Sequence, residues 1–361
     1  MSRTPANAKS PVMIMAGGTG GHIFPGLAVA AELAARKVPV IWLGARGGLE
    51  TRLVPQHDLP LETLKIGGVR GKGLLTALRT PFRLLGSIAA ARQLMKRHAP
   101  RSVLSMGGYA AAPGGFAAWL SHVPIVVHEQ NRIPGVTNRL LARLAQRVLS
   151  GFPDVFAHGV WVGNPVRAAI FAIAPPAARY AGREGPLRLL VLGGSQGAAS
   201  LNTQLPEMLR RRGARIAVDV RHQCGEKHVE KTRAAYLSAG IEAEVVAFID
   251  DMAAAYAWAD LAICRAGALT LAELAAAGVP ALLVPYPHAV DDHQTKNAEA
   301  MVAAGAARLV GEGDEFIKRL GSALAEAADR ARLLRMAEAA RTLARSDAAQ
   351  RIADACLEVA A

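Results

Sequence analysis

Cysteine and aromatic residues are scarce in this sequence. Only Cys224, Cys264 and Cys356 occur among 361 residues, with no CxxC pair and no histidine at metal-ligand spacing. This argues against a disulfide framework or a zinc site and fits a reducing compartment. Aromatic residues make up 5% of the chain, which disfavours recognition of nucleic acid by base stacking.

Acidic residues are missing from one long segment. Residues 63–128 contain no Asp or Glu but nine Lys and Arg. The first 167 residues carry twenty Lys and Arg against six Asp and Glu, whereas the rest carries twenty-two against twenty-three. The net charge of +13 therefore comes from the first half, which predicts a surface there that meets an anion, either nucleic acid or an anionic membrane.

The chain also lacks an uninterrupted apolar run that would span a membrane. Residues 102–127 are free of Asp, Glu, Lys and Arg, but glycine pairs, Pro113 and Pro124 divide them into short elements. Between residues 74 and 95, basic side chains alternate with Leu, Ile and Phe, a pattern typical of a helix lying on a bilayer. The alternative is that the leucines pack on a sheet while the basic residues face water. We expect peripheral attachment to a membrane.

Strands alternate with helices in both halves of the sequence, which predicts parallel sheets covered on both faces. The first half has predicted strands at 12–16, 38–43, 61–66, 102–106, 124–128 and 147–150, and predicted helices at 26–35, 74–98, 114–120 and 137–144. Predicted strands resume at 187–192, 215–222, 243–248, 261–264, 281–284 and 307–310. We predict two Rossmann-like α/β domains facing each other across a cleft, residues 1–166 and 167–344, with helix 345–361 packing back on the first.

A glycine-rich loop follows the first strand of each half. The loops span residues 17–22 and 193–197, and neither contains the GxGxxG fingerprint or the Lys-Ser/Thr of a nucleotide-hydrolysing phosphate loop. Bare backbone at a helix N-terminus suits phosphate groups. The loops therefore predict diphosphate binding without nucleotide hydrolysis, with an ordinary strand-to-helix turn as the alternative.

The second half contains a more specific series of motifs. Gly267 opens a predicted helix that carries Thr270 and Glu273 in its first turns. Its N-terminus suits a diphosphate, and the carboxylate suits the two hydroxyls of a ribose, although a capping carboxylate is the alternative for Glu273 alone. Residues 291–297 form a polar cluster that we expect to be a loop beside a sugar.

Taken together, these motifs resemble the MurG family over nearly the whole chain. The matching segments are 17–22, 24–28, 71–73, 106–109, 128–131, 163–167, 193–197, 248–252, 264–270 and 291–297. The resemblance implies a GT-B fold and an inverting, metal-independent transfer without a cofactor. N-acetylglucosamine would pass from UDP-N-acetylglucosamine to the 4-hydroxyl of the muramyl sugar of lipid I, giving lipid II for peptidoglycan synthesis. The implied place is the cytoplasmic face of the inner membrane, as a peripheral protein.

The resemblance also implies the site residues. Those that would meet the donor are Thr19, Gly20, Gly21, Asn131, Arg167, Ser195, Ile249, Ala268, Leu269, Thr270, Leu271, Ala272, Glu273 and Gln294. Ser195 would meet the diphosphate, Ile249 the uracil and Gln294 the sugar. The acceptor diphosphate would lie between Gly17 and Gly18 on one side and Gly107, Gly108 and Tyr109 on the other. Ala266 stands where the family often has serine, so a hydroxyl at that position is dispensable or its role is lost.

An inverting transfer needs a base that deprotonates the acceptor hydroxyl. His22 is our candidate, with His128 and Glu129 as rivals, and a purely positioning histidine is the alternative. A UDP-N-acetylglucosamine 2-epimerase of similar fold is a second hypothesis, but it has no need of a basic surface. A non-enzymatic polyanion-binding protein would explain the charge but not the ordered motifs of the second half. We therefore expect an anionic membrane as a partner and no nucleic acid.

Overall fold

The computed structural model describes residues 10–66, 74–194, 197–212, 216–287 and 292–360, with no side-chain description for 74–82 and 212. The chain divides into two compact units. Unit 1 comprises Met1–Arg167 and Arg345–Ala361, and unit 2 comprises Ala168–Ala344. The chain passes from one unit to the other after Arg167 and again before Arg345.

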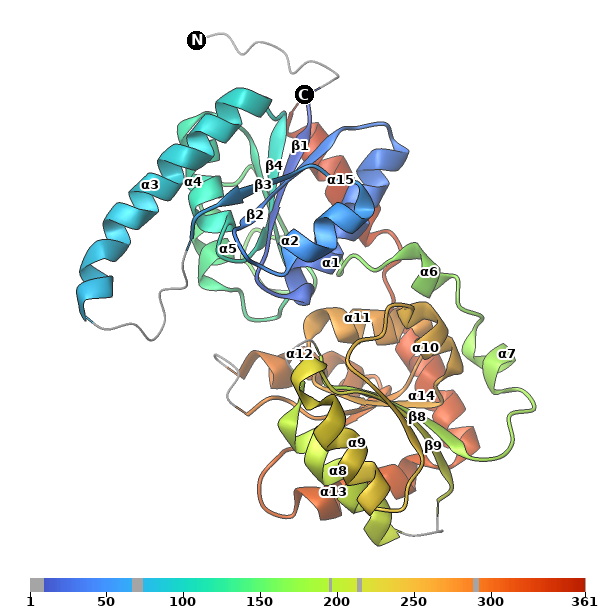
Figure 1. The fold of residues 1–361 in the computed structure, drawn as a ribbon. Helices are drawn as coiled ribbons and strands as arrows, with labels where there is room; N and C mark the ends of the chain where they lie inside the picture. Colours follow the sequence, from blue (N-terminus) through green and yellow to red (C-terminus); the bar gives the residue numbers. More distant parts are fainter. Residues whose placement is uncertain (1–9, 67–73, 195–196, 213–215, 288–291, 361) are drawn as a thin grey trace. The chain divides into compact units, whose positions relative to one another are not determined.

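Unit 1 is built on a seven-stranded parallel sheet in the order β3-β2-β1-β4-β5-β6-β7 (Figure 1). The strands are β1 (Val12–Ala16), β2 (Val40–Ala45), β3 (Leu61–Leu64), β4 (Ser102–Gly107), β5 (Ile125–Glu129), β6 (Arg147–Ser150) and β7 (Val160–Trp161). All five residues of β1 are buried, as expected for a central strand covered on both faces. The short edge strand β7 had not been predicted.

Helices cover both faces of this sheet (Figure 1). They are α1 (Gly20–Ala35), α2 (Glu50–Leu53), α3 (Leu74–His98), α4 (Ala111–Leu120), α5 (Val136–Leu141) and α15 (Ala348–Glu358), with a 3₁₀ turn at Val54–His57. Val12 and Ile14 of β1 pack with α1 and α15, whereas Met13 and Met15 pack with α3, α4 and α5. The alternation follows from the two-residue period of a strand.

The C-terminal helix α15 is an integral part of unit 1. The Ser102 hydroxyl donates a hydrogen bond to the Cys356 carbonyl oxygen over 2.7 Å. Arg36 near the end of α1 forms an ion pair with Asp354, and Ile352 is completely buried in the same core. The last residues of the chain therefore complete the core of the first half.

Helix α1 begins six residues earlier than predicted. The prediction started at Gly26, but the helix starts at Gly20, and so Gly20, Gly21 and His22 form its first turn. The residues before 26 had been left out of the helix because glycine disfavours helices locally, whereas tertiary packing overrides that preference: Ile23, Pro25 and Gly26 are buried. His22 therefore lies on a helix rather than at the end of a loop.

Unit 2 contains a six-stranded parallel sheet in the order β10-β9-β8-β11-β12-β13. Its strands are β8 (Leu187–Leu192), β9 (Val218–Gln223), β10 (Ala243–Val246), β11 (Leu261–Cys264), β12 (Ala281–Leu283) and β13 (Ala307–Leu309). Its helices are α6 (Ala168–Phe171), α7 (Pro176–Tyr180), α8 (Ala199–Arg212), α9 (Val229–Ser238), α10 (Met252–Trp258), α11 (Ala268–Ala277), α12 (His293–Ala303), α13 (Phe316–Ala327) and α14 (Arg330–Thr342). A further 3₁₀ turn spans Glu226–His228.

The prediction of two α/β domains with parallel sheets is confirmed, and a second local prediction is wrong. Residues 293–297 were expected in a loop, but they form the first turns of α12. Their polar side chains had been taken as a sign of irregular structure. However, Asn297 is completely buried and its amide donates to the Ala266 carbonyl over 3.3 Å, so burial in the unit explains one of these polar residues.

Both sheets place a strand reversal next to a glycine loop. In unit 1 the order reverses between β1 and β4, and in unit 2 between β8 and β11. Ligands of open parallel sheets bind outside the carboxyl ends of strands at such a switch point. The loop at 17–22 follows β1 and the loop at 193–197 follows β8, so each glycine loop lies at the switch point of its own sheet.

Candidate functional site

The acceptor residues predicted in unit 1 come together at its switch point. Ala16 is paired with Gly107 across β1 and β4. A Cβ added at Gly108 would lie 2.4 Å from the Gly17 carbonyl oxygen, and one added at Gly18 would lie 3.9 Å from the Tyr109 ring. Gly18, Gly107 and Gly108 all have positive φ, of 86°, 103° and 92°. Only glycine adopts this conformation at low cost.

Glu50 is a residue of this region that the sequence analysis missed. Its side chain is completely buried, and its Oε2 accepts a hydrogen bond from the Gly18 backbone N–H over 3.0 Å. This N–H is therefore engaged by a carboxylate in the structure, and a diphosphate would have to use other groups. The available sequence signal was the position of an acidic residue just after β2, the strand beside β1.

His22 has a defined tautomer. Its Nδ1 lies 3.1 Å from the Gly17 carbonyl oxygen and 3.4 Å from the Thr19 hydroxyl. A carbonyl oxygen only accepts, so Nδ1 carries the proton and Nε2 carries the lone pair. Burial lowers the pKa of His22, although the charges of Glu129 and Glu50 and the bond to Gly17 act in the opposite direction. The imidazole is thus neutral at pH 7 and able to accept a proton at Nε2.

The two rival bases are occupied by structural hydrogen bonds. His128 Nε2 donates to the Gly163 carbonyl over 2.9 Å, its Nδ1 accepts from Gln130, and burial lowers the pKa of His128 to about 4. The carboxylate of Glu129 accepts four hydrogen bonds, two from Asn131 and one each from Gly135 and Asn138. Both side chains are buried, which leaves His22 as the better candidate.

The remaining predicted residues of unit 1 surround the start of α1. Thr19 is the N-cap of the helix and is exposed, as is Gly21. The Arg167 guanidinium lies 5.2 Å from the centre of the Phe24 ring, and that ring would be 3.1 Å from a Cβ at Gly20. Arg167 and Gly20 thus both lie next to the Phe24 ring.

In unit 2, α11 begins at the predicted position. Gly267 is its N-cap, and the first N–H groups of an α-helix have no acceptor within the helix. Ala268, Leu269 and Leu271 are buried, so their side chains pack in the core, while Thr270 and Ala272 are half-buried. Any ligand contact by Leu269 or Leu271 would have to use backbone atoms.

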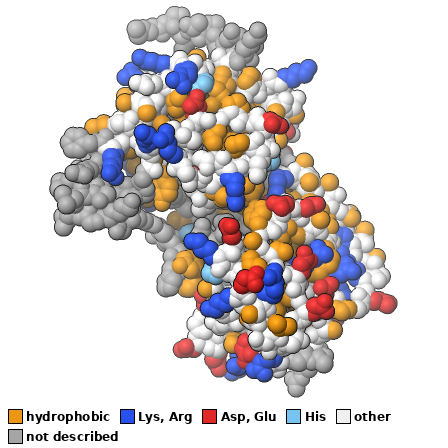
Figure 2. Space-filling view, viewed as in Figure 1, with side chains coloured by type: hydrophobic (Ala, Val, Ile, Leu, Met, Phe, Trp, Pro, Cys, Tyr) orange, Lys and Arg blue, Asp and Glu red, His pale blue; other side chains and the backbone are white. Residues whose placement is uncertain are grey.

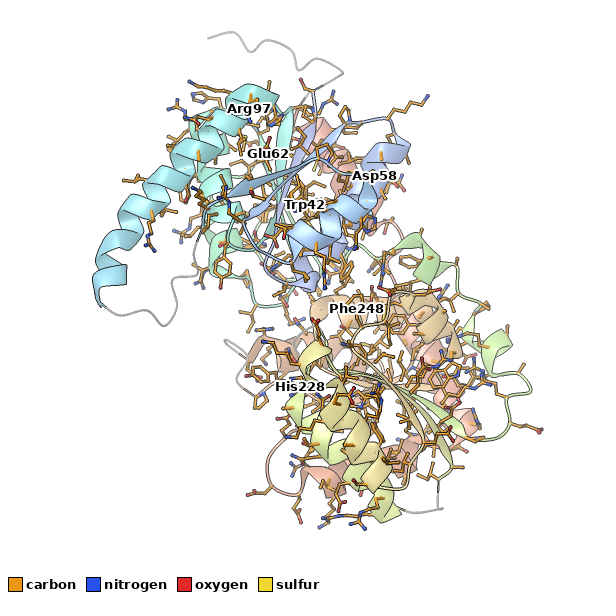
Figure 3. All side chains as sticks on the ribbon, in the orientation of Figure 1. Trp42, Asp58, Glu62, Arg97, His228 and Phe248 are labelled. Atoms are coloured by element: carbon orange, nitrogen blue, oxygen red, sulfur yellow. The ribbon has the colours of Figure 1, made fainter. Side chains whose placement is uncertain are left out.

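Glu273 has its carboxylate held by a neighbouring helix. The side chain is buried, and the Tyr256 hydroxyl of α10 donates to its Oε2 over 3.0 Å. Ile249, between β10 and α10, is half-buried, and the preceding Phe248 is exposed (Figure 3). The structure thus brings Glu273 next to Tyr256, a partner that the sequence analysis had not identified.

The second glycine loop is held by Gln223 at the end of β9. The Gly194 N–H donates to Gln223 Oε1 over 2.9 Å, and Gln223 Nε2 donates to the Gly194 carbonyl over 3.0 Å. Gly197 has a φ of 74°, and a Cβ there would lie 2.3 Å from the Cys224 carbonyl oxygen. Ser195 lies outside the described residues.

Gln294 lies in the first turn of α12. Its Oε1 accepts a hydrogen bond from the Tyr286 backbone N–H over 2.9 Å. The Tyr286 ring is covered by the Arg265 guanidinium at 5.4 Å, and Arg265 also forms an ion pair with Glu312. Arg265, just before Gly267, therefore connects α11 to the segment that precedes α12 and was also missed by the sequence analysis.

No metal centre is formed by the described part of the chain. Within it, no group of three or more His, Cys, Asp or Glu side chains is placed to hold a metal ion. Likewise, none of the helices in that part is both long and apolar enough to cross a membrane. Metal-independent transfer stays a prediction.

Comparison with known proteins decides the family. Residues 12–150 match the glycosyltransferase family 28 N-terminal domain, and residues 188–352 match the glycosyltransferase family 28 C-terminal domain. A UDP-N-acetylglucosamine--N-acetylmuramyl-(pentapeptide) pyrophosphoryl-undecaprenol N-acetylglucosamine transferase of Xanthomonas axonopodis pv. citri (strain 306) is 58% identical over 357 residues, covering 99% of this chain and 84% of that protein. A protein of the same name from Xylella fastidiosa (strain M12) is 57% identical over 350 residues, 96% of each chain. The chain belongs to the MurG family of glycosyltransferases.

Solved structures agree with membership of the MurG family. The crystal structure of Acinetobacter baumannii MurG matches with a TM-score of 0.81 at 39% identity, covering 97% of this chain and 99% of that chain. A UDP-N-acetylglucosamine 2-epimerase from Neisseria meningitidis matches with a TM-score of 0.64 at 13% identity, which shows a shared fold alone. The epimerase hypothesis is therefore not favoured, whereas the predicted GT-B fold and family are confirmed.

Proposed function

We propose that this MurG-family chain transfers N-acetylglucosamine from UDP-N-acetylglucosamine to the 4-hydroxyl of the muramyl sugar of lipid I, giving lipid II. The observation that carries the proposal is the 58% identity, over 99% of the chain, to a transferase named for these two substrates. Unit 2 would hold the donor, and the switch point of unit 1 would hold the acceptor. The undecaprenyl-diphosphate of lipid I and the diphosphate of UDP are both anions that suit helix N-termini and bare backbone.

The reaction we propose is a single in-line displacement. The acceptor 4-hydroxyl gives its proton to His22 Nε2 while its oxygen bonds to the anomeric carbon of N-acetylglucosamine. The bond between that carbon and the UDP oxygen breaks, and UDP leaves with the electron pair, so the anomeric configuration inverts. The neutral His22, with its proton held at Nδ1 by the Gly17 carbonyl, is suited to this role.

Stabilisation of the leaving diphosphate is proposed for the start of α11. Its unpaired N–H groups and positive dipole end would face the charge that develops on UDP. Glu273, oriented by Tyr256, would accept hydrogen bonds from the ribose hydroxyls. Ser195 would meet the diphosphate, Ile249 the uracil and Gln294 the sugar. No metal ion or cofactor is needed in this scheme.

Peripheral attachment to the cytoplasmic face of the inner membrane is proposed through α3 and α4. Arg83, Leu84 and Leu85 on α3 are exposed, Leu85 by 63%, and Trp119 on the adjacent α4 is exposed by 50%. Figure 2 shows basic side chains between apolar ones on unit 1, with few acidic ones, whereas unit 2 mixes both signs. Such a mixture favours an anionic bilayer. The side chains of residues 74–82, which belong to the predicted amphipathic stretch, lie outside the description, as do residues 67–73.

The far end of α3 is a less suitable contact. Arg97 and His98 both lie close to Glu62 of β3, at 3.7 and 2.8 Å (Figure 3). This carboxylate offsets part of the positive charge at the C-terminal end of the helix. The residues of α3 that we propose to contact the membrane are therefore the exposed ones nearer its middle, Arg83, Leu84, Leu85 and Arg92, of which Leu85 and Arg92 share one side of the helix.

One transfer assay tests the proposed reaction. The purified chain is mixed with radiolabelled UDP-N-acetylglucosamine and a lipid I analogue, with and without EDTA. We expect labelled lipid II with a β-linked sugar, at equal rates in both conditions. Conversion of the donor without acceptor would instead indicate an epimerase, and a rate abolished by EDTA would contradict metal independence. Salt-sensitive binding to nucleic acid without affinity for UDP would contradict the enzyme proposal.

A further inference from the structure

Glu50 sits in a space formed by three glycines. Cβ atoms added at Gly17, Gly44 and Gly48 would lie 2.2, 2.5 and 2.4 Å from atoms of its side chain. No real Cβ approaches so closely, so each of these positions has to lack a side chain for the carboxylate to be accommodated. The three glycines come from the opening turn after β1, from β2 and from the turn after β2. The turns of two neighbouring strands are thus shaped around one buried acidic group.

The hydrogen bonds of Glu50 join these two turns. Its Oε1 accepts from the Ala45 backbone N–H over 2.7 Å, and its Oε2 accepts from the Gly18 N–H over 3.0 Å. The residue before Gly18 is Gly17, whose carbonyl oxygen accepts from His22 Nδ1. A short path therefore leads from the carboxylate through the opening turn to the imidazole.

Glu50 and Glu129 are the charged groups that act on His22 among the described residues. Glu50 belongs to α2, and Glu129 to the end of β5. Glu129 is engaged by four donors from its own turn and from α5, whereas Glu50 is engaged by the turn that directly holds His22. Both carboxylates therefore act electrostatically on the His22 ring, but only Glu50 also holds the turn to which that ring is hydrogen-bonded.

We propose that Glu50 is a positioning residue for the transfer reaction: it fixes the Gly17–Gly18 turn, thereby orients His22, and stabilises the imidazolium that forms when His22 takes the acceptor proton. This inference rests on the proposed role of His22 as base. It explains why a buried acidic residue stands beside a site for an anionic acceptor. The carboxylate is buried, so it acts on the backbone N–H groups of the turn and on the His22 ring and is not exposed to the ligand.

Substitutions can separate the contribution of the negative charge of Glu50 from that of the size and position of its side chain. Glu50→Gln keeps the size but presents an NH₂ group to one of two N–H donors, so it loses one hydrogen bond and the charge. Glu50→Asp keeps the charge but shortens the reach. Gly48→Ala keeps Glu50 itself and displaces its carboxylate, because the new Cβ would lie 2.4 Å from Oε2. Gly311→Ala is the matched control, since a Cβ there meets nothing within 4 Å.

The experiment combines the titration of His22, followed by NMR of its ring signals, with the pH profile of kcat/KM on a soluble acceptor. The His22 signals are assigned by their loss in His22→Gln. In Glu50→Gln we expect a lower pKa of His22, because one of the two carboxylates that raise it is gone, and an acid limb of the profile that moves to lower pH. The expected loss of kcat is about tenfold or more, with an unchanged KM for the donor. Glu50→Asp should recover the pH profile more than the rate.

Gly48→Ala should lower kcat as Glu50→Gln does, and the two changes together should cost less than the sum of their separate effects, because they act on one contact. Gly311→Ala should retain the wild-type rate. An unshifted His22 titration in folded Glu50→Gln, judged by an unchanged circular dichroism spectrum, would overturn the inference. A shifted titration with an unchanged pH–rate profile would leave the positioning by Glu50 standing. It would instead overturn the proposed role of His22 as base.

Discussion

The backbone of Gly108 lies directly against that of Gly17. A Cβ at Gly108 would be 2.4 Å from the Gly17 carbonyl oxygen and 3.0 Å from its nitrogen. This contact joins the turn after β4 to the turn after β1 at the switch point of the sheet. Because the same Gly17 carbonyl holds His22 Nδ1, the spacing of the two turns sets the position of the proposed base.

Two glycine substitutions separate backbone strain from this contact. Gly18 and Gly108 have similar positive φ values, 86° and 92°, so alanine at either costs about 1–3 kcal/mol of strain. Only Gly108→Ala also forces the two turns apart, since a Cβ at Gly18 meets nothing closer than the Tyr109 ring at 3.9 Å. We expect Gly108→Ala to lower stability and turnover clearly more than Gly18→Ala, as measured by urea denaturation and transfer assays. Equal effects would contradict the importance of the contact.

Removal of His22 should affect the chemical step and not donor binding. If His22 is the general base, His22→Ala should lower kcat by a factor of about 10²–10⁴. Binding of UDP by calorimetry should stay at the wild-type level, because the residues proposed to hold the uracil, the ribose and the leaving diphosphate lie in unit 2. The matched comparison is Thr19→Ala, which removes the longer 3.4 Å contact with Nδ1 and leaves the imidazole in place. A His22→Ala protein that keeps most of its turnover would rule out the assignment.

Glu273 should contribute to donor affinity. Glu273→Gln removes an acceptor for the ribose hydroxyls, and we expect UDP to bind about tenfold or more weakly, as for other hydrogen bonds to charged groups. Tyr256→Phe removes the hydrogen bond that orients Glu273 but keeps the carboxylate, so its effect should be smaller. Calorimetric titration with UDP measures both. A larger loss of UDP affinity for Tyr256→Phe than for Glu273→Gln would contradict direct binding of the ribose by the Glu273 carboxylate.

Charge reversal on α3 should uncouple membrane binding from catalysis. Arg83→Glu with Arg92→Glu is expected to weaken binding to anionic liposomes by roughly tenfold or more per residue. Turnover on a short-chain soluble acceptor should change little; the same prediction holds with Arg79→Glu added, although that side chain is outside the description. Arg335→Glu on α14 is an exposed control in unit 2. Equal losses of liposome binding and turnover would contradict a membrane role for this face.

Two buried histidines should make the fold sensitive to acid. Burial lowers the pKa of His128 to about 4 and that of His222 to about 3, from an ordinary value of 6.5. Below pH 6.5 the unfolded chain binds protons that the folded chain does not, so the free energy of unfolding falls as pH is lowered toward these values. Each histidine should contribute about 1.4 kcal/mol per pH unit in that range.

Urea denaturation between pH 7 and about pH 4.5 measures this slope. His128→Asn should reduce the dependence of the free energy of unfolding of unit 1 on pH, even if it lowers that free energy at pH 7. The exposed His57→Asn serves as the control, because its ring meets solvent in both states. A wild-type slope that His128→Asn leaves unchanged would show that other groups cause the acid sensitivity.

The sequence was sufficient for the architecture and for which segments carry the candidate site. The strand β1 was predicted with its observed bounds because a continuous apolar run followed by glycines is a strong local pattern. The start of α1 and the first turns of α12 were missed, since glycine, proline and polar residues favour loops locally. In both cases packing within the unit decided otherwise, as the burial of Pro25 and Asn297 shows.

What the sequence by itself determined is the pair of parallel α/β sheets, the family and the glycine turns at the strand ends. These features depend on local patterns and on the order of motifs along the chain. Only the tertiary structure decided that His22 carries its proton on Nδ1, that His128 and Glu129 are engaged elsewhere, and that Glu50 holds the opening turn. Gly18 and Glu50 are 32 positions apart, and no local pattern specifies a hydrogen bond over that separation. It arises because β1 and β2 lie side by side and bring their two turns together.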